Sequence, residues 1–511
     1  MSHYFYDEES VDKPTKKLIQ SQLEAQVQTK DQIQDDLRLS LQTEGNRQVL
    51  EEIKQGRVLD IKIAGKTNSQ KNILKAYKTI EKWINRKGIS DARLFYLKLN
   101  GEVNLIQITA ASPEHARKIF QTINARGLGL DAIDIVKDIL YQRTVQDLSE
   151  SDRLFDTWEK MKSKIEDVDR EPMRFFRYFL MASYETDGGL KNSNVTKWFE
   201  DNDAQIKYSQ EPIQFVESLE ASADTYRSLV IDHKCPDDSK SNELESITLL
   251  GGKSARQHLM VLLAGEPLPT EHFNRLVRNL EVVLFYSLLT AERSQTLEKN
   301  MLQWSKSVRA VCVAKNYKVL DQIYDDMAET YKEPIRQFED RIRNVEWQSS
   351  KDRLRYFLAK INSLVDRINF PSPPDDSLRQ YATAKSYHVE HILPLNPSKC
   401  LLDALNVNSE IYEINVNKLG NLMLLDGVQN VIASNKPYSE KISSYKKSNL
   451  LMVRHMVGEV DFSEDTVKSH RKSKDIANEL RSFEDFTIES IDRRQEMLLA
   501  LTKMIWYLPH D

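Results

Sequence analysis

Length, composition and charge narrow the classes of protein that this chain can form. It has 511 residues, of which 40% are hydrophobic and 29% charged, with a mean hydropathy of −0.54 and a net charge of −5. The length predicts two to four domains. The charge excludes a uniformly basic nucleic-acid binder but allows a local basic surface. Glycine and proline number only 15 each, which favours helices over an all-β fold.

The cysteines and the apolar runs predict the cellular location of the protein. Cys235, Cys312 and Cys400 are widely spaced and form no CxxC motif, so we expect neither a disulfide framework nor a cysteine zinc site. No run approaches the ~18 apolar residues of a membrane span, and the first residues lack the pattern of a signal peptide. A cytoplasmic protein without a membrane segment is expected.

The first part of the chain predicts helices and one hairpin. Residues 14–57 are polar and rich in Gln, Lys and Asp, and we expect long exposed helices there. Residues 69–88 carry apolar side chains at helical spacing and end near a glycine, which indicates an amphipathic helix. Residues 92–112 have the pattern of a β-hairpin whose turn is Asn100-Gly101. Helices are expected again over 112–127 and from about residue 130.

The rest of the chain is predicted to be mostly helical. Residues 150–365 give one helical pattern after another, and residues 272–289 are apolar enough to be buried. Three prolines interrupt residues 368–385 and mark a boundary, and residues 487–506 are predicted to form the closing helix. We therefore expect a mainly α protein with small α+β parts, divided into domains 1–145, 146–370 and 371–511.

The stretch "YHVEHILP" begins the constellation that could carry chemistry. Glu390 precedes His391, Asn421 follows 30 residues later, and Asn430 lies nine residues beyond Asn421. Hydrolysis of a phosphodiester needs a base near neutral pKa, such as histidine, and a hard cation held by oxygen ligands. Adjacent residues of a regular strand point to opposite faces, so we expect a bend just before Pro394 to bring the two side chains together.

These residues resemble the HNH, or ββα-metal, nuclease motif. "EH" is similar to its first strand, and "GNLMLL" with the later Asn is similar to its second strand and helix. The resemblance implies that His391 is the general base, that Glu390 and Asn430 hold Mg²⁺ or Mn²⁺, and that Asn421 braces the loop and orients His391. A Glu-His pair or a GNL turn alone is more often structural, but the combined spacing favours the nuclease interpretation.

The sequence gives weaker support for a functional role of other polar residues near the motif. His388 is either a partner or extra ligand at the metal site or an ordinary core or solvated histidine. Lys436, Lys441, Lys446 and Lys447, together with the basic cluster at 468–474, could contact DNA phosphates. A lysine on a surface helix is more often simply solvated.

A second stretch, "IFQTINARGLGLDAIDIVKDIL", resembles the signature of the GmrSD-like family. These modification-dependent (type IV) restriction and phage-defence nucleases join a ParB-like nucleotide-binding module, a helical region and a C-terminal HNH module, and the likeness covers most of residues 40–511. It implies that Asn124, Arg126 and Asp134 complete a nucleotide or modification site. The alternative is that Asn124 to Gly127 simply caps a helix.

The family's Asp-Gly-Gln-Gln-Arg motif does not occur in this sequence. We therefore expect half of the ParB-like domain to be missing, either lost or supplied by a separately encoded ParB-like subunit. The leading hypothesis is a metal-dependent endonuclease or nickase subunit that acts on phage or modified DNA in antiphage defence. The alternatives are a non-catalytic helical scaffold or regulatory subunit with a degenerate HNH module, and a nucleotide-driven switch.

Overall fold

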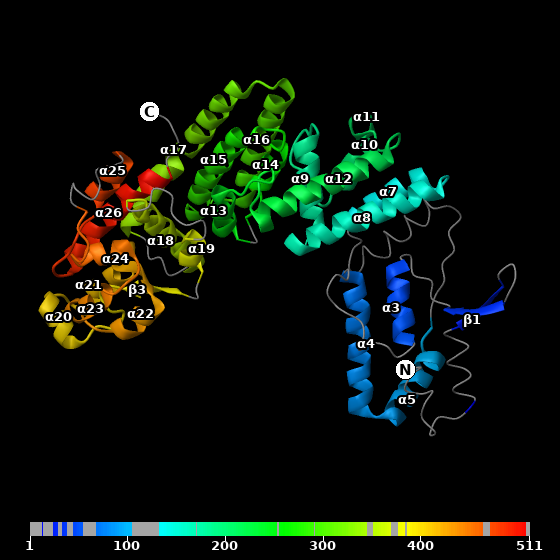
Figure 1. The fold of residues 1–511 in the computed structure, drawn as a ribbon, viewed down its shortest axis with the longest axis horizontal. Coiled ribbons are helices and arrows are strands. Elements are labelled where there is room, and N and C mark those ends of the chain that lie inside the picture. The colour runs from blue at the N-terminus through cyan, green and yellow to red at the C-terminus, as the bar shows by residue number, and fades with distance from the viewer. Residues whose placement is uncertain are drawn as a thin grey trace. The chain divides into compact units, whose positions relative to one another are not determined.

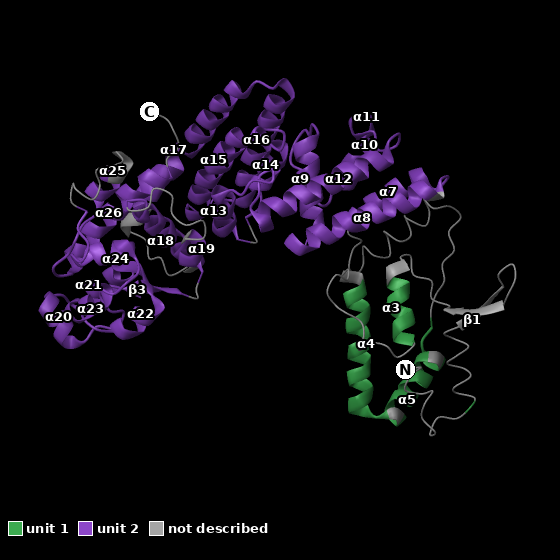
Figure 2. Cartoon of the chain, in the orientation of Figure 1, with its two compact units in different colours: residues 1–130 green, residues 131–511 purple. Residues whose placement is uncertain are grey.

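The computed structural model separates the chain into two compact units, residues 1–130 and residues 131–511 (Figures 1 and 2). The structure describes residues 13, 24–28, 33–37, 44–54, 68–104, 132–169, 171–252, 255–290, 292–344, 351–368, 377–383, 386–462 and 471–506. It is mainly helical with small strand pairs, as the sequence predicts. The division into three domains stays a prediction.

The described residues of the first unit form a hairpin and three helices. Strands β1 and β2 pair antiparallel with Gln28 opposite Ile33. Long exposed helices were expected over residues 14–57, and this is wrong for the two strands, whereas α3 is helical. A segment that is polar on every side carries no periodicity that distinguishes a strand from a helix. The elements are β1 (Glu24–Gln28), β2 (Ile33–Leu37), α3 (Glu44–Lys54), α4 (Asn68–Lys87) and α5 (Ile89–Glu102).

Helix α5 replaces the first arm and the turn of the hairpin expected over residues 92–112. Ala92 and Tyr96 are one helical turn apart and buried, and Trp83 of α4 lies 5.2 Å from Phe95 between ring centroids. Packing against α4 therefore overrides the turn preference of Asn100-Gly101. Residues beyond 104 in the expected second arm lie outside the described residues.

The second unit is built almost entirely from helices around one continuous hydrophobic core. Helix α15 is buried along most of its length, as the sequence predicts for residues 272–289. The helices before the strands are α7 (Ala132–Thr144), α8 (Leu148–Val168), α9 (Pro172–Ser183), α10 (Val195–Asp201), α11 (Asp203–Ile206), α12 (Pro212–Arg227), the π-helix η2 (Ser228–Asp232), α13 (Asn242–Gly251), α14 (His258–Ala264), α15 (Thr270–Leu289), α16 (Ser294–Ala314), the 3₁₀ helix η3 (Tyr317–Val319), α17 (Leu320–Asn344), α18 (Lys351–Asp366) and α19 (Ser377–Ala382).

The remaining elements of this unit gather at its C-terminal end, yellow to red in Figure 1. They are β3 (Tyr387–His391), α20 (Lys399–Leu405), α21 (Ser409–Val416), the 3₁₀ helix η5 (Leu419–Asn421), β4 (Leu422–Asp426), α22 (Gly427–Ala433), α23 (Tyr438–Tyr445), α24 (Leu451–Met456), α25 (Arg471–Glu479) and α26 (Ile488–Ile505). The closing helix predicted over residues 487–506 is confirmed by α26.

The C-terminal helix α26 is anchored in the helical core by an aromatic stack. Trp506 stacks on Phe285 at 3.8 Å between centroids and with an interplanar angle of 5°, and it lies 5.6 Å from Phe357. The Tyr286 hydroxyl donates to the Trp506 carbonyl, and the indole donates to Glu281. These contacts join α26 to α15 and α18, and so give the strand region a rigid support.

Stability of the helical core is expected to fall as the solution becomes acidic, because of His258. Burial, aided by the charge of Arg256, lowers the pKa of this imidazole from 6.5 to about 3. The unfolded chain therefore takes up a proton below its pKa of about 6.5 while the folded chain does not, and His258 contributes a loss of about 2 kcal/mol between pH 7 and pH 5.

Urea unfolding at the two pH values, on the wild type and on His258→Leu, measures this loss. The variant is expected to show a shallower fall in the free energy of unfolding. Equal falls in the two proteins would show that His258 does not titrate in the unfolded chain alone.

Candidate functional site

Strands β3 and β4 and helix α22 form the local framework of the site. The strands pair antiparallel, with Glu390 opposite Met423 and His391 opposite Leu422. Every residue of β4 is buried, and α22 follows it directly. The two strands and the helix that carries Asn430 thus occur in the order and at the places that the sequence predicts.

The turn into β4 is fixed by helix α26. The buried guanidinium of Arg494 donates to the carbonyls of Gly420 and Leu422, both at 2.8 Å. A methyl group on Gly420 would overlap with the Ile491 carbonyl of α26. The lack of a side chain at Gly420 is therefore what allows the turn to lie directly on the helix backbone.

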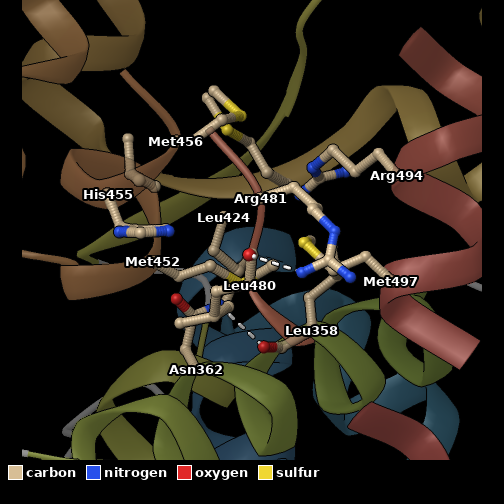
Figure 3. A pocket seen from close by; sticks show the side chains of 12 residues that line it. Leu358, Asn362, Leu424, Met452, His455, Met456, Leu480, Arg481, Arg494 and Met497 are labelled. Carbon is tan, nitrogen blue, oxygen red and sulfur yellow. Dashed lines mark hydrogen bonds between the residues drawn. The ribbon is translucent and has the colours of Figure 1, made fainter. Parts of the chain in front are cut away.

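A small cavity lies on the inner side of β4, between α18, α24 and α26 (Figure 3). Its volume is about 10 Å³, and it is lined by methionines such as Met452 and Met497 and by Asn362 and Arg494. This volume suffices for one water molecule at most. The cavity is therefore a packing defect beside the site and not a place for a substrate.

Asn421 clamps the chain that follows β3. It is completely buried. Its Oδ1 accepts from the Leu393 N–H at 2.7 Å, and its Nδ2 donates to the carbonyls of Leu393 at 3.0 Å and Val416 at 2.8 Å. These contacts fasten the segment after β3 to the turn before β4, and the role of Asn421 in catalysis stays a prediction. They reach the backbone two residues after His391, and the imidazole itself is held by another residue.

The carboxylate of Glu390 is buried among three donors. Its Oε1 accepts from Lys441 Nζ at 2.7 Å and from the Tyr445 hydroxyl at 2.9 Å. Its Oε2 accepts from Asn430 Nδ2 at 2.9 Å. The structure thus brings Glu390 and Asn430, the two expected metal ligands, into direct contact, but it also adds two donors from α23.

Lys441 is a buried residue and not a surface lysine. Its side chain is 1% exposed, and its Nζ also donates to the His391 carbonyl at 2.6 Å. The ammonium is therefore engaged inside the protein and has no path to a DNA phosphate. Burial raises the pKa of Glu390 and lowers the pKa of Lys441, while the attraction within the pair opposes both shifts.

His391 lies at the end of β3 and is half-buried. Its Nε2 lies 3.4 Å from Oδ1 of Asn417, an oxygen that can accept only from a protonated nitrogen. This contact leaves Nδ1 as the proton acceptor of the ring. Burial lowers the pKa of His391, which favours the neutral form that a general base requires.

Glu390 and His391 contact different groups. The ladder between the strands continues through His391, and the chain bends at Ile392 and Leu393, just before Pro394. The bend thus follows both residues, so Glu390 faces α22 and α23 while His391 faces Asn417. The alternation of side chains along a strand accounts for this separation.

A surface hollow of about 580 Å³ opens beside the first residues of β3 and α22. His388, Asp426, Gln429 and Lys447 are among its lining residues. His388 is half-buried, and its ring lies 3.6 Å from where a side chain on Gly427 would begin. None of these contacts makes His388 a metal ligand, and its role stays a prediction.

The other lysines that were expected to contact DNA differ in their exposure and in their partners. Lys436 is exposed and donates to the Ile432 carbonyl at the end of α22. Lys446 pairs with Glu459 at 3.2 Å, and Lys447 is exposed beside the hollow. In the cluster at 468–474, Lys474 is exposed, and residues 468–470 lie outside the described residues.

Of the three residues predicted for a nucleotide or modification site, the structure describes only Asp134. Asn124 and Arg126 lie outside the described residues. Asp134 is exposed in the first turn of α7, with Oδ1 4.0 Å from Lys162 Nζ. This surface ion pair gives no support to a nucleotide site, which stays a prediction.

The donors around Glu390 do not suit a divalent cation as they stand. The carboxylate that should face the metal faces an ammonium group, and the Asn430 amide points its Nδ2 at the same carboxylate. Within the described residues, no group of three or more His, Cys, Asp or Glu side chains is placed to hold a metal. The expected Mg²⁺ or Mn²⁺ therefore stays a proposal.

Two residues at this site could not be assigned from the motif alone. Asn417 lies between α21 and η5 and carries no sequence signal that distinguishes it from other asparagines. Lys441 could have been recognised, because Tyr438, Ile442 and Tyr445 define an aromatic and apolar stripe on α23. Lys441 lies on that stripe at helical spacing, and such a position predicts burial.

Comparisons with known families define the class of the protein as a restriction endonuclease. The C-terminal domain of GmrSD restriction endonucleases matches residues 332–501, and the N-terminal domain of the same family matches residues 3–141. Together they span more than half of the chain, which therefore belongs to the GmrSD restriction endonuclease family. Its domains suggest a nuclease in phage-defence restriction. A search of curated proteins finds no match.

The N-terminal match corrects one expectation from the sequence. The N-terminal domain was expected to be half missing because the Asp-Gly-Gln-Gln-Arg motif does not occur, and this is wrong, since residues 3–141 match the domain. A separately encoded ParB-like subunit is accordingly not supported. A five-residue motif can be absent while the patterning of more than a hundred residues still defines a domain.

The structure contains no helix in its described residues that is long and apolar enough to span a membrane. Cys235, Cys312 and Cys400 are all unpaired.

Proposed function

We propose that the chain is a DNA endonuclease or nickase of an antiphage restriction system, with β3, β4 and α22 as an HNH-type cleavage centre. One observation carries this proposal. The antiparallel strands and the following helix place Asn430 Nδ2 2.9 Å from Oε2 of Glu390, which lies 40 residues earlier in the chain and directly precedes His391. The family membership supports a nuclease, and the HNH assignment is the finer step.

His391 is the proposed general base. A neutral imidazole accepts the proton of a water molecule through Nδ1, and the hydroxide oxygen attacks the phosphorus of a DNA phosphodiester. A new P–O bond forms as the bond to the leaving oxygen breaks, and that oxygen takes up a proton. Asn417 would keep the ring in the required tautomer, and Asn421 would hold the chain after His391 in place.

The cation is part of the proposal. Mg²⁺ or Mn²⁺ would supply positive charge at the phosphate when bound, but the Glu390 carboxylate is paired with Lys441 in this structure. The DNA is proposed to lie along the surface that exposes Lys436 and Lys447. Such contacts would make binding weaker as the salt concentration rises. Phage or modified DNA as the target, and a cytoplasmic location, stay predictions.

Cleavage of plasmid DNA tests the proposal. The purified chain is incubated with supercoiled plasmid in Mg²⁺ or Mn²⁺, and a parallel sample contains a chelator. Conversion to the nicked or linear form is expected in at least one metal. Intact plasmid under every condition would contradict the nuclease function.

A second candidate function is a non-catalytic scaffold whose HNH module only folds the C-terminus. The buried Glu390–Lys441 pair favours it, because that pair stabilises the module without any chemistry. The scaffold predicts DNA binding without cleavage, or neither. The plasmid experiment therefore separates the two candidates.

If the nuclease function holds, Asn417→Ala is expected to slow cleavage roughly fivefold, since one hydrogen bond contributes about 1 kcal/mol. The contact with Nε2 orients His391 and fixes its tautomer. The measurement is the initial rate of plasmid conversion together with its pH profile. A rate and a profile equal to those of the wild type would remove Asn417 from the site.

A further inference from the structure

Lys441 places a positive charge where the resemblance expects a metal ion. Its Nζ lies 2.7 Å from Oε1 of Glu390 and 2.6 Å from the His391 carbonyl oxygen. Both are oxygens of the two residues that the HNH resemblance assigns to chemistry. An ammonium between a carboxylate and a carbonyl uses the same kind of ligands that a hard cation would use.

The carboxylate of Glu390 has no room for a second cation while α23 is seated. Lys441 and Tyr445 lie one turn apart on α23 and both donate to Oε1, and Asn430 of α22 occupies Oε2. The Lys441 side chain is 1% exposed and that of Glu390 is 8% exposed. Two positive charges a few ångströms apart in a buried place repel each other strongly.

Helix α23 is firmly held in this position. Tyr438 and Tyr445 are buried, with their rings 6.2 Å apart between centroids. The Tyr438 hydroxyl donates to the Phe483 carbonyl at 2.7 Å. The packing of α23 therefore fixes the position of Lys441 inside the protein.

We propose that Lys441 is an internal cation that competes with a divalent metal ion for Glu390. A metal ion then reaches Glu390 only when Lys441 is displaced from the carboxylate. This inference rests on the proposed function, because it takes Glu390 as the carboxylate that meets the cation.

Titration calorimetry with Mn²⁺ tests the competition on the full chain. Lys441→Met is expected to bind Mn²⁺ at least about tenfold more tightly than the wild type, because a competing charge has gone. The double variant Glu390→Gln/Lys441→Met is expected to lose this gain. Lys436→Met, which removes an exposed lysine of the same region, is the matched control and should bind as the wild type does.

Thermal unfolding gives a second readout, in case Lys441→Met folds poorly. Mn²⁺ is expected to raise the unfolding midpoint of Lys441→Met, since a ligand that binds only the folded chain stabilises it. It should leave the wild type and the double variant nearly unchanged. If Mn²⁺ does not stabilise Lys441→Met, or if it binds the double variant equally well, the competition does not exist.

These outcomes are separate from the proposed nuclease function. Unchanged Mn²⁺ affinity in Lys441→Met overturns the competition even if the wild type cuts plasmid. Conversely, a gain in affinity supports the competition even if the wild type cuts no DNA under the conditions used.

Discussion

Replacing Lys441 with methionine is expected to lower the free energy of unfolding by about 3–5 kcal/mol, the usual cost of removing one partner of a buried ion pair. Methionine fills much of the lysine volume, so the loss reports mainly on charge. The Glu390 carboxylate would keep the Tyr445 and Asn430 donors but would be buried without the ammonium beside it. Urea unfolding at neutral pH and without divalent cations measures the change.

Two companion variants sharpen this result. Glu390→Gln/Lys441→Met removes both charges and should recover much of the lost stability, because replacing a whole buried pair is often nearly neutral. Lys436→Met removes an exposed lysine and should change stability by at most about 0.5 kcal/mol. If the double variant is no more stable than Lys441→Met, the pair does not act as a charge pair.

Asn421→Ala is expected to destabilise the chain by about 3–5 kcal/mol, because it leaves buried polar groups without partners. The wild-type side chain satisfies the N–H and carbonyl of Leu393 and the carbonyl of Val416. Leu393 and Val416 are themselves buried, so water cannot replace the lost partner. Urea unfolding again gives the free energy, and plasmid cleavage should fall in parallel because the chain after His391 is no longer fixed.

Asn415→Ala is the matched control for this change. Asn415 is also buried, but its Nδ2 makes one hydrogen bond, to the Ile411 carbonyl one turn earlier in α21. Its loss should cost about 1 kcal/mol. Similar losses in the two variants would mean that Asn421 is an ordinary buried asparagine and not a clamp.

The strands and helix of the site could be predicted from the sequence because their signals are local. These signals do not depend on tertiary packing. They are an apolar, β-branched run before Pro394, a second apolar run after Gly420, and the fixed sequence spacing to Asn421 and Asn430. The stripe on α23 indicates that Lys441 is buried, but its pairing with Glu390 depends on which helix packs against β3, and the contact of Asn417 depends on how α21 ends. These features depend on tertiary packing. The pairing with Lys441 occupies the Glu390 carboxylate that was expected to bind a metal ion.

The N-terminal unit was predicted less well, for two physical reasons. Asn100-Gly101 is a strong turn signal, yet α5 runs through it because Phe95 contacts Trp83 of α4 and Tyr96 is buried. The polar segment that holds β1 and β2 gives no periodic signal at all. The N-terminal domain is recognised by a family match over residues 3–141, although the Asp-Gly-Gln-Gln-Arg motif does not occur.

The central claim is that His391 cleaves DNA, and one experiment tests it most directly. The wild type, His391→Ala and His272→Ala are compared for their rates of conversion of supercoiled plasmid. His272 is also half-buried, but it lies on α15, packed against Tyr317 and away from the strands. The wild type and His272→Ala are expected to cut at similar rates, and His391→Ala is expected to be slower by about 10²–10⁴-fold. Equal rates for the wild type and His391→Ala would contradict the central claim.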